Sequence, residues 1–255
     1  MVKDSNERKT RIYGLLGKDI DYSFSRGYFA EKFEREGISD AQYVNFDIPA
    51  IEEFKQVIST EQLAGLNVTI PYKEQVIPFL DRIDGDAEQI GAVNTIALTP
   101  DGLTGYNTDA YGFEQSLLPL LGHTRGQALV LGTGGASKAV VFVLQKMGFS
   151  PTQVSRNPKG NQIHYNELDR ENLGRFDLIV NTTPLGTHPN TTAKADIPYE
   201  GIRPHQLAYD LIYNPSKTAF LEAFEQRGAR IQNGLRMLEL QAEKAWAIWQ
   251  QYPIR

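Results

Sequence analysis

The sequence predicts an α/β protein of two domains, built on mostly parallel sheets covered by helices. One observation is the rhythm of the chain, because short apolar runs typical of buried strands alternate with longer segments of helical period. The other is a glycine-rich turn at residues 132–135, which follows an apolar strand and precedes a helix. With 255 residues, the chain is long enough for two small domains.

Strand and helix signals alternate along the first half of the chain. Residues 11–17 form an apolar run that ends in glycine, and Gly37 is well placed to terminate the helix before it. Thr99–Gly102 contains Pro-Asp-Gly and predicts the turn of a hairpin between residues 92–98 and 103–106. The other expected strands are 43–48 and 65–70, and the expected helices are 26–36, 51–58 and 73–83.

A second series of strands and helices begins at Gln127, and a last helix is expected at the end of residues 231–251. The boundary between the domains is expected near residues 108–112, where the first sheet ends and a linking helix starts. The expected strands are 128–131, 153–155, 178–181 and 207–211, and the expected helices are 137–147 and 218–227.

The composition is ordinary for a soluble globular protein, with 41% hydrophobic and 22% charged residues. Mean hydropathy is −0.38, and no apolar run approaches the ~20 residues that a membrane helix needs. Residues 1–10 are polar throughout and lack the apolar core of a secretory signal. The chain has no cysteine, which excludes disulfides, thiolate metal sites and cysteine nucleophiles and fits a cytoplasmic protein.

Neither nucleic acid nor a metal ion is expected as a partner. The net charge is −5, and no cluster of lysine and arginine stands out along the chain. The four histidines are scattered and do not have the spacing of metal ligands. They are His123, His164, His188 and His205.

The turn that follows the strand at 128–131 has the residues of a pyrophosphate-binding loop. Its glycines let the backbone approach a phosphate closely, and the amides that open the next helix supply donors and a positive dipole end. The spacing departs from Gly-x-Gly-x-x-Gly, because alanine and serine occupy the region of the third glycine. A purely structural turn is the alternative. The candidate residues are Gly132, Gly134, Gly135, Ala136 and Ser137.

The end of the next strand favours NADP(H) over NAD. An NAD site places an acid there to bind the 2′-hydroxyl of the ribose. This chain instead has Ser155, Arg156 and Asn157. A guanidinium there can hold a 2′-phosphate through paired hydrogen bonds. The alternative is that Arg156 is a solvated surface charge.

Three polar residues, Asn181, Thr182 and Thr183, close another strand of the same sheet. Ligands of open α/β sheets bind beyond the carboxyl ends of the strands. These residues are therefore candidates to contact the ribose and phosphate on the nicotinamide side. The sequence Asn-Thr-Thr-Pro is also compatible with a plain turn.

Two further segments suggest a lysine–aspartate pair. Lys73 comes soon after the strand-like run Leu66–Ile70, and Asp109 ends the segment Gly105–Asp109 in similar surroundings. A lysine and a carboxylate facing a dinucleotide can move a hydride and a proton to or from a small polar substrate. Taken alone, Lys73 would be interpreted as a solvated lysine at the start of a helix.

Five motifs agree in order and spacing with those of shikimate dehydrogenases, and the resemblance covers nearly the whole chain. The family's His-Ser-x-Ser-Pro is altered here, because Tyr22 and Arg26 replace the histidine and the proline. In the cofactor loop, the family's Asn-Arg-Thr appears as Ser-Arg-Asn, and Lys138 stands where arginine is usual. The matching segments are Asn67–Lys73, Gly91–Thr95, Gly105–Gly112, Asp210–Pro215 with Thr218, and Gly234–Gln241.

The resemblance implies the reversible, NADP-dependent reduction of 3-dehydroshikimate to shikimate. It also implies a discontinuous substrate domain of residues 1–108 plus 236–255 and a Rossmann-like NADP-binding domain of residues 109–235. The active site is expected in the cleft between these domains. The expected partner is the small-molecule substrate, and the protein is expected to be either a monomer or a homodimer.

The resemblance further implies roles for single residues. Lys73 is expected to donate a proton to the carbonyl oxygen, and Asp109 to accept from a substrate hydroxyl and orient the lysine. Hydroxyl groups can hold a carboxylate without an arginine. The expected carboxylate ligands are Ser23 and Ser25, with Thr69 and Tyr213 nearby. Asn94 and Gln241 would bind ring hydroxyls. Leu211 and Gly234 would line the nicotinamide pocket.

Three alternatives stay open. A quinate/shikimate dehydrogenase that uses NAD would need room for an extra hydroxyl near the carboxylate site, and an acid near Arg156. A non-catalytic protein that binds NADP(H) or shikimate is disfavoured by the intact Lys73 and Asp109. A folate-type dehydrogenase has a related two-domain plan, but the pair Ser23 and Ser25 does not suit a pterin.

Overall fold

The computed structural model describes residues 10–21, 23–122 and 126–252. The chain divides into two compact units. Unit 1 comprises Met1–Thr108 and Ala242–Arg255, and unit 2 comprises Asp109–Gln241. The chain passes between the units within two helices, α4 (Thr108–Leu121) and α8 (Leu235–Trp249).

Unit 1 contains a six-stranded sheet of order β2-β1-β3-β5-β6-β4. The pairs β1/β2, β1/β3 and β4/β6 are parallel, whereas β3/β5 and β5/β6 are antiparallel. The antiparallel part arises at the predicted hairpin, where Gly102 adopts a φ of 104° that favours glycine. The strands are β1 (Arg11–Gly17), β2 (Ala41–Asp47), β3 (Leu63–Val68), β4 (Arg82–Ile83), β5 (Thr95–Thr99) and β6 (Gly102–Tyr106).

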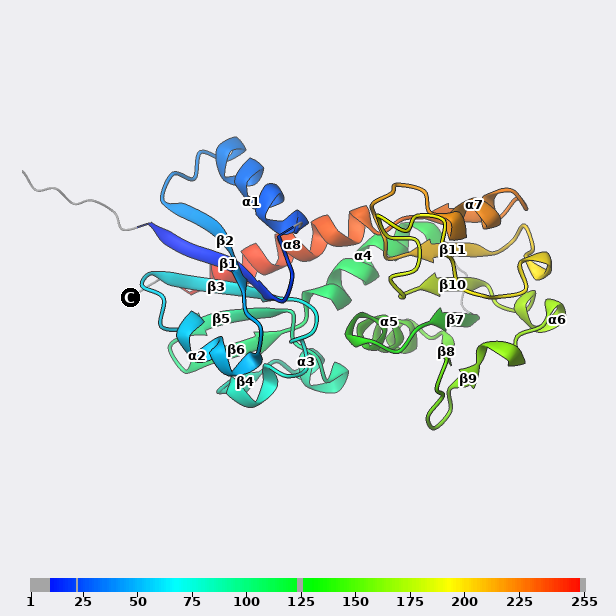
Figure 1. Ribbon diagram of the computed structural model, residues 1–255, viewed down its shortest axis with the longest axis horizontal. Helices are drawn as coiled ribbons and strands as arrows, with labels where there is room; N and C mark the ends of the chain where they lie inside the picture. The colour runs from blue at the N-terminus through cyan, green and yellow to red at the C-terminus, as the bar shows by residue number, and fades with distance from the viewer. Residues whose placement is uncertain (1–9, 22, 123–125, 253–255) are drawn as a thin grey trace, which may run out of the picture. The chain divides into compact units, whose positions relative to one another are not determined.

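Helices cover both faces of the unit 1 sheet, as Figure 1 shows. On one face α1 (Phe24–Arg35) and α8 pack against β1 and β2, with Phe29 stacked on Tyr43 at 4.5 Å between ring centroids. On the other face α2 (Phe54–Val57) and α3 (Gly85–Ile90) pack through residues such as Phe54 and Ala87. In β3, Leu63, Leu66 and Val68 belong to this second core and Ala64 to the first, because an irregularity in the pairing of β1 with β3 interrupts strict alternation.

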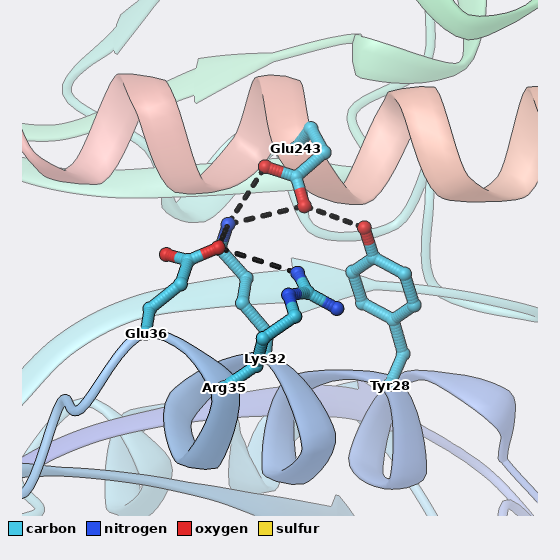
Figure 2. Close-up of polar contacts among 5 residues, drawn as sticks. All are labelled: Tyr28, Lys32, Arg35, Glu36 and Glu243. Carbon is cyan, nitrogen blue, oxygen red and sulfur yellow. Dashed lines mark hydrogen bonds and ion pairs between the residues drawn. The ribbon is translucent and has the colours of Figure 1, made fainter.

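A buried lysine fastens α1 to α8 (Figure 2). Lys32 is only 3% exposed, and its Nζ lies 2.8 Å from carboxylate oxygens of both Glu36 and Glu243. Tyr28 also donates to Glu243. Burial lowers the pKa of Lys32, but the contacts with the two carboxylates outweigh it and leave the pKa above its ordinary value. Lys32 is therefore charged and paired, and it holds the helix that begins beside Ser23.

Unit 2 contains a six-stranded sheet of order β12-β11-β10-β7-β8-β9, in which every pair is parallel. Counted from β7, the order is 3-2-1-4-5-6, which is the doubly wound arrangement. The direction of winding reverses between β7 and β10. The strands are β7 (Gln127–Leu131), β8 (Ser150–Ser155), β9 (Ile163–His164), β10 (Leu178–Asn181), β11 (Leu207–Asp210) and β12 (Arg230–Gln232).

Helices also cover the sheet of unit 2. The short helix α6 (Arg170–Leu173) and α7 (Ala219–Glu225) contribute Leu173, Phe220 and Phe224 to a core that includes residues of β7, β10 and β11. Helix α5 (Gly135–Lys146) packs against β7 and β8. Helix α4 packs against β11, since the Ser116 hydroxyl lies 2.7 Å from Tyr209 Oη.

The helix predicted over residues 73–83 is wrong. Residues 70–76 form turns, Ile77–Phe79 form one 3₁₀ turn (η2), and Arg82 and Ile83 form a strand. Pro78 supplies no backbone N–H and disfavours a helical conformation in the residue before it, which opposes a regular helix through this segment. Leu80 is extended, and the chain then joins β6 as β4.

The other expected elements are present, with shifted ends. The predicted helix 26–36 begins at Phe24, and Gly37 follows its end with a φ of 66°, as the sequence indicated. The predicted helix 51–58 is a 3₁₀ turn, η1 (Ile51–Glu53), followed by α2. Several short elements were not predicted, namely α3, α6, β9, β12 and the 3₁₀ turns η3 (Tyr165–Glu167) and η4 (Tyr199–Gly201).

Candidate active site

The segment that carries Lys73 is fixed by hydrogen bonds to neighbouring parts of unit 1. The Thr69 amide donates to the Leu16 carbonyl at 2.9 Å, which ties the end of β3 to β1. The Tyr72 hydroxyl is buried and donates to the Ile48 carbonyl at 2.7 Å. The Lys73 carbonyl accepts from the Val93 amide at 2.8 Å. These bonds hold the backbone on both sides of the half-buried Lys73 side chain.

Ser23 and Ser25 lie at the start of α1. Ser23 is the N-cap, and its Oγ accepts from the Ser25 amide at 3.2 Å. Ser25 is buried, and its hydroxyl lies beside the phenol of Tyr43. Burial raises the pKa of Tyr43 far above its ordinary value, and the Ser25 hydroxyl offsets this only in part. Arg26 is exposed, and Tyr22 lies outside the described residues.

Asn94 and Asp109 are held by the beginning of α4. Asn94 Oδ1 accepts from the Thr108 amide at 2.6 Å and from the Thr108 hydroxyl at 3.1 Å. An amide N–H can only donate, so this contact fixes which way the Asn94 side chain points. Its Nδ2 is then the group suited to donate to a substrate oxygen. Asp109 follows Thr108 in the first turn of α4 and is 8% exposed.

In unit 2, the loops after β7 and β10 meet where the sheet reverses its winding. Gly132 has a φ of 109°, and a Cβ there would lie 2.7 Å from Thr182 Oγ1 and 3.2 Å from a Thr183 methyl carbon. Only glycine fits this close approach without displacing its neighbours. The Thr182 hydroxyl in turn donates to the Leu131 carbonyl at 2.7 Å. This is the position at which doubly wound sheets bind their ligands.

The glycine loop opens directly into α5. Gly134 is the N-cap, and the space around its α-carbon is open. Gly135 and Ala136 form the first turn, whose amides have no helical acceptor and suit an anion. Ser137 was predicted to contact the cofactor. Its buried hydroxyl instead donates to the Gly132 carbonyl at 2.7 Å and accepts from Gln153. The Ser137 hydroxyl therefore links the first turn of α5 to the start of the glycine loop.

The residues predicted to select NADP(H) follow β8. The Asn157 amide donates to Ser155 Oγ at 3.1 Å, which forms a tight turn at the carboxyl end of the strand. Arg156 is exposed within this turn. Burial raises the pKa of Tyr165, and the positive charge of Arg156 opposes that rise in part. Its role toward a 2′-phosphate stays a prediction.

Asp210, which the sequence analysis placed only within a matching motif, joins several predicted site segments. Its Oδ1 accepts from Asn181 Nδ2 and from the Ile212 amide, each at 3.0 Å. Its Oδ2 accepts from the Thr218 hydroxyl at 2.6 Å. Burial raises the pKa of Asp210 to about 6, although these donors lower it in part. No residue spacing would have revealed this role, because it depends on the pairing of β10 with β11.

Asn181 and Thr183 form a small turn beside Asp210. Asn181 Oδ1 accepts from the Thr183 amide at 3.1 Å and from its hydroxyl at 2.7 Å. Gly234 lies against Leu211, because a Cβ at Gly234 would overlap the Leu211 carbonyl. The predicted residues of the nicotinamide side therefore form two adjoining pairs at the carboxyl ends of β10 and β11.

The remaining predicted ligands belong to unit 2. Tyr213 is half-buried in the segment after β11, and Gln241 is buried on α8, where its Nε2 donates to the Leu238 carbonyl at 2.9 Å. Lys73 belongs to unit 1 and Asp109 to unit 2. The structure thus groups Ser25 and Asn94 within unit 1, and the glycine loop with Asn181–Thr183 within unit 2. The roles of all these residues toward ligands stay predictions.

Among the described residues, no group of three or more histidine, aspartate or glutamate side chains is arranged to hold a metal ion. Over the same residues, no helix has the length and apolar character to cross a bilayer.

The strand order and the loop at Gly132 define unit 2 as a Rossmann-type, dinucleotide-binding fold. Residues 15–96, in unit 1, match the model of the shikimate dehydrogenase substrate binding domain. A relative from Methanococcus maripaludis, a shikimate dehydrogenase (NADP(+)), is 38% identical over 95% of this chain and 92% of its own length.

Solved structures agree with this match. A shikimate dehydrogenase in complex with NADP+ has a TM-score of 0.86 and 32% identity, covering 95% of this chain and 90% of its own. The enzyme from Thermus thermophilus, in complex with NADP(H) and shikimate, has a TM-score of 0.83 and 31% identity, covering 96% and 95%. The chain belongs to the shikimate dehydrogenase family.

Proposed function

We propose that this protein catalyses the reversible reduction of 3-dehydroshikimate to shikimate with NADPH. One observation carries the proposal: a family member at 38% identity acts as a shikimate dehydrogenase (NADP(+)), and this chain keeps a lysine, an aspartate and the glycine loop in the matching motifs. The fold supplies what such a reaction requires, namely a doubly wound sheet with an open loop at its reversal point and a half-buried lysine on a fixed turn.

When bound, NADPH supplies a hydride to the ketone carbon. Lys73 donates a proton to the carbonyl oxygen, and its charge stabilises the negative charge that develops there. In the reverse direction Lys73 accepts the proton of the hydroxyl. Asp109, at the first turn of α4, accepts from an adjacent substrate hydroxyl and orients Lys73. Hydride transfer requires the substrate and the cofactor to bind next to each other, and the proposal includes one site shared by both.

Substrate recognition uses uncharged donors. Ser23 and Ser25, with Thr69 and Tyr213, bind the carboxylate, and Asn94 and Gln241 bind ring hydroxyls. The orientation of Asn94 supports its part, because Thr108 occupies Oδ1 and leaves Nδ2 to donate. A site built to hydrogen-bond hydroxyls rejects analogues that lack them by up to about 10⁴-fold.

The cofactor residues follow from the loops of unit 2. The open space at Gly134 and the first amides of α5 suit a pyrophosphate. Ser155, Arg156 and Asn157 hold the 2′-phosphate, which gives the preference for NADP(H). Leu211, Gly234 and the turn Asn181–Thr183 face the nicotinamide side. The small-molecule substrate is the partner, the protein is a monomer or a homodimer, and it acts in the cytoplasm.

The test is a panel of absorbance measurements at 340 nm. Shikimate and quinate are each combined with NADP+ and with NAD+, and the initial rate of reduced cofactor formation is recorded. We expect the highest kcat/KM with shikimate and NADP+. Turnover mainly with quinate or with NAD+ would move the protein to the alternative activity. Binding of NADP+ without turnover in any combination would instead identify a non-catalytic binding protein.

A further inference from the structure

A continuous set of buried hydrogen bonds crosses the sheet of unit 1. It begins at Tyr43 on β2, whose Oη reaches across β1 and donates to Asn67 Oδ1 on β3 at 2.8 Å. Asn67 Nδ2 then donates to Thr95 Oγ1 on β5 at 3.1 Å and to the Asn94 carbonyl at 3.3 Å. All four residues are buried, with exposures between 0% and 6%.

The far end of this network reaches α4. The hydroxyls of Thr95 and Thr108 lie 3.1 Å apart, and each also lies 3.1 Å from Asn94 Oδ1, to which it can donate its one proton. Together with the Thr108 amide, three donors therefore converge on one oxygen of Asn94. Asp109 is the next residue of α4. The geometry of Asn94 and of the first turn of α4 consequently depends on Thr95, which Asn67 holds.

The near end of the network reaches α1. The Ser25 hydroxyl lies beside the phenol of Tyr43, and the Tyr43 ring stacks on Phe29 of the same helix. Tyr43 thus stands between Ser25 and Asn67. In the proposed function these two ends have different tasks, since Ser25 binds the substrate carboxylate and Asn94 binds a ring hydroxyl.

The donor and acceptor of each hydrogen bond explain why the other residues of the network depend on Tyr43. A phenol has one proton to donate, and here it goes to Asn67 Oδ1. That contact fixes the orientation of the Asn67 amide, so that Nδ2 points to Thr95 and Asn94. Without it, a buried acceptor loses its donor, and buried polar networks are costly when they are only partly satisfied. Asn67 would then turn or recruit water, and Thr95 and Asn94 would shift with it.

We propose that Tyr43 is a positioning residue of the substrate site, which sets Asn67 and, through Asn67, holds Asn94 and Thr108 in one arrangement with Ser25. This inference rests on the proposed function, in which Ser25 and Asn94 bind the substrate. Tyr43 makes no contact with the substrate in this account.

Unit 1 offers a closely matched control. Tyr13 pairs in register with Tyr43 on the neighbouring strand, belongs to the same apolar core and is 1% exposed. Its hydroxyl accepts from Arg11 at 3.4 Å and from Gln250 at 3.3 Å, which are not members of the network. Tyr13→Phe and Tyr43→Phe therefore each remove one buried hydroxyl from the same core, but only Tyr43→Phe removes a donor from the network.

The first measurement compares steady-state kinetics of the two variants. We expect Tyr43→Phe to raise KM for shikimate by about tenfold, while KM for NADP+ stays at the wild-type value. Tyr13→Phe is expected to leave both constants unchanged. In the Asn67→Ala background, Tyr43→Phe is expected to add no further change, because its effect passes through Asn67. An equal KM for shikimate in wild type and Tyr43→Phe would overturn the proposal.

The second measurement does not depend on activity. Hydrogen–deuterium exchange of the Thr108 amide reports the bond to Asn94 Oδ1 directly. We expect faster exchange in Tyr43→Phe than in wild type and Tyr13→Phe. Unchanged exchange would overturn the proposal even if KM rose. A wild-type protein that does not turn over shikimate would refute the proposed function, whereas the exchange result would still decide whether Tyr43 holds the network.

Discussion

At the scale of single residues, the buried carboxylate of Asp210 holds three segments of unit 2 together, but its burial reduces the stability of the folded protein when it is ionised. It is buried, and Asn181, Ile212 and Thr218, the groups that donate to it, are all uncharged. A buried carboxylate without a cation is destabilised when it ionises, and this is why its pKa rises to about 6. Its three bonds join β10, β11 and the start of α7, so the carboxylate fixes the segment that contains Leu211 and Tyr213.

The pH dependence of stability tests this description. The folded pKa of about 6 lies above the ordinary value of 3.8, so the folded state binds more protons than the unfolded state between these pH values. Asp210 therefore makes the free energy of unfolding fall as pH rises from about 4 to about 6, by about 3 kcal/mol at most. Asp210→Asn should lack this fall.

The measurement is urea unfolding of wild type and Asp210→Asn at several pH values between 4 and 7. The variant should gain stability relative to wild type as pH rises through this range. Asp177→Asn is a suitable comparison, because Asp177 is also in unit 2 and its carboxylate accepts from the Gln127 amide. A stability difference for Asp210→Asn that is the same at every pH would contradict the account.

The sequence indicated the candidate residues for ligand binding and catalysis, but not which residues hold them in place. Lys73, Asp109 and the glycine loop were identified because their neighbours along the chain carry the signal. Tyr43 and Asp210 act through bonds to residues that are distant in sequence, for example Asn67 and Asn181. Such contacts depend on which strands are neighbours, and alternation of apolar residues does not specify that.

At the scale of elements, the loops at the carboxyl ends of the unit 2 strands carry the cofactor prediction. The glycine loop was predicted from a strand followed by glycines and a helix, and β7, Gly132 and α5 have that order. The same kind of reasoning failed over residues 73–83, because the apolar spacing there resembles a helix while Pro78 interrupts it. The spacing of apolar residues predicted an element correctly where the glycines and prolines nearby were compatible with that element.

Arg156, at the end of β8, gives the prediction that belongs to this scale. Arg156→Ala should raise KM for NADP+ by about tenfold or more and leave KM for NAD+ unchanged, because only NADP+ carries the 2′-phosphate. Initial rates at 340 nm with shikimate measure both constants. Arg175→Ala, another exposed arginine of unit 2, is the control and should change neither. An equal effect of Arg156→Ala on both cofactors would show that Arg156 does not recognise the phosphate.

At the scale of the whole molecule, the α/β class was predictable and the sheet orders were not. Alternating strands and helices predicted parallel sheets, and all five pairs in unit 2 and three of five in unit 1 are parallel. The reversal of winding between β7 and β10 appeared only in the structure. This reversal places the glycine loop beside the loop after β10, where Gly132 lies against Thr182 and Thr183.

The most direct test of the central claim is the kcat of Lys73→Ala for shikimate oxidation with NADP+. Removal of a general acid–base group is expected to lower kcat by about 10²–10⁴-fold, with KM for NADP+ unchanged. Lys55→Ala, an exposed lysine of α2 in the same unit, should keep the wild-type rate. A folded Lys73→Ala protein with a kcat close to that of wild type would contradict the account, because no proton donor would then be needed at this position.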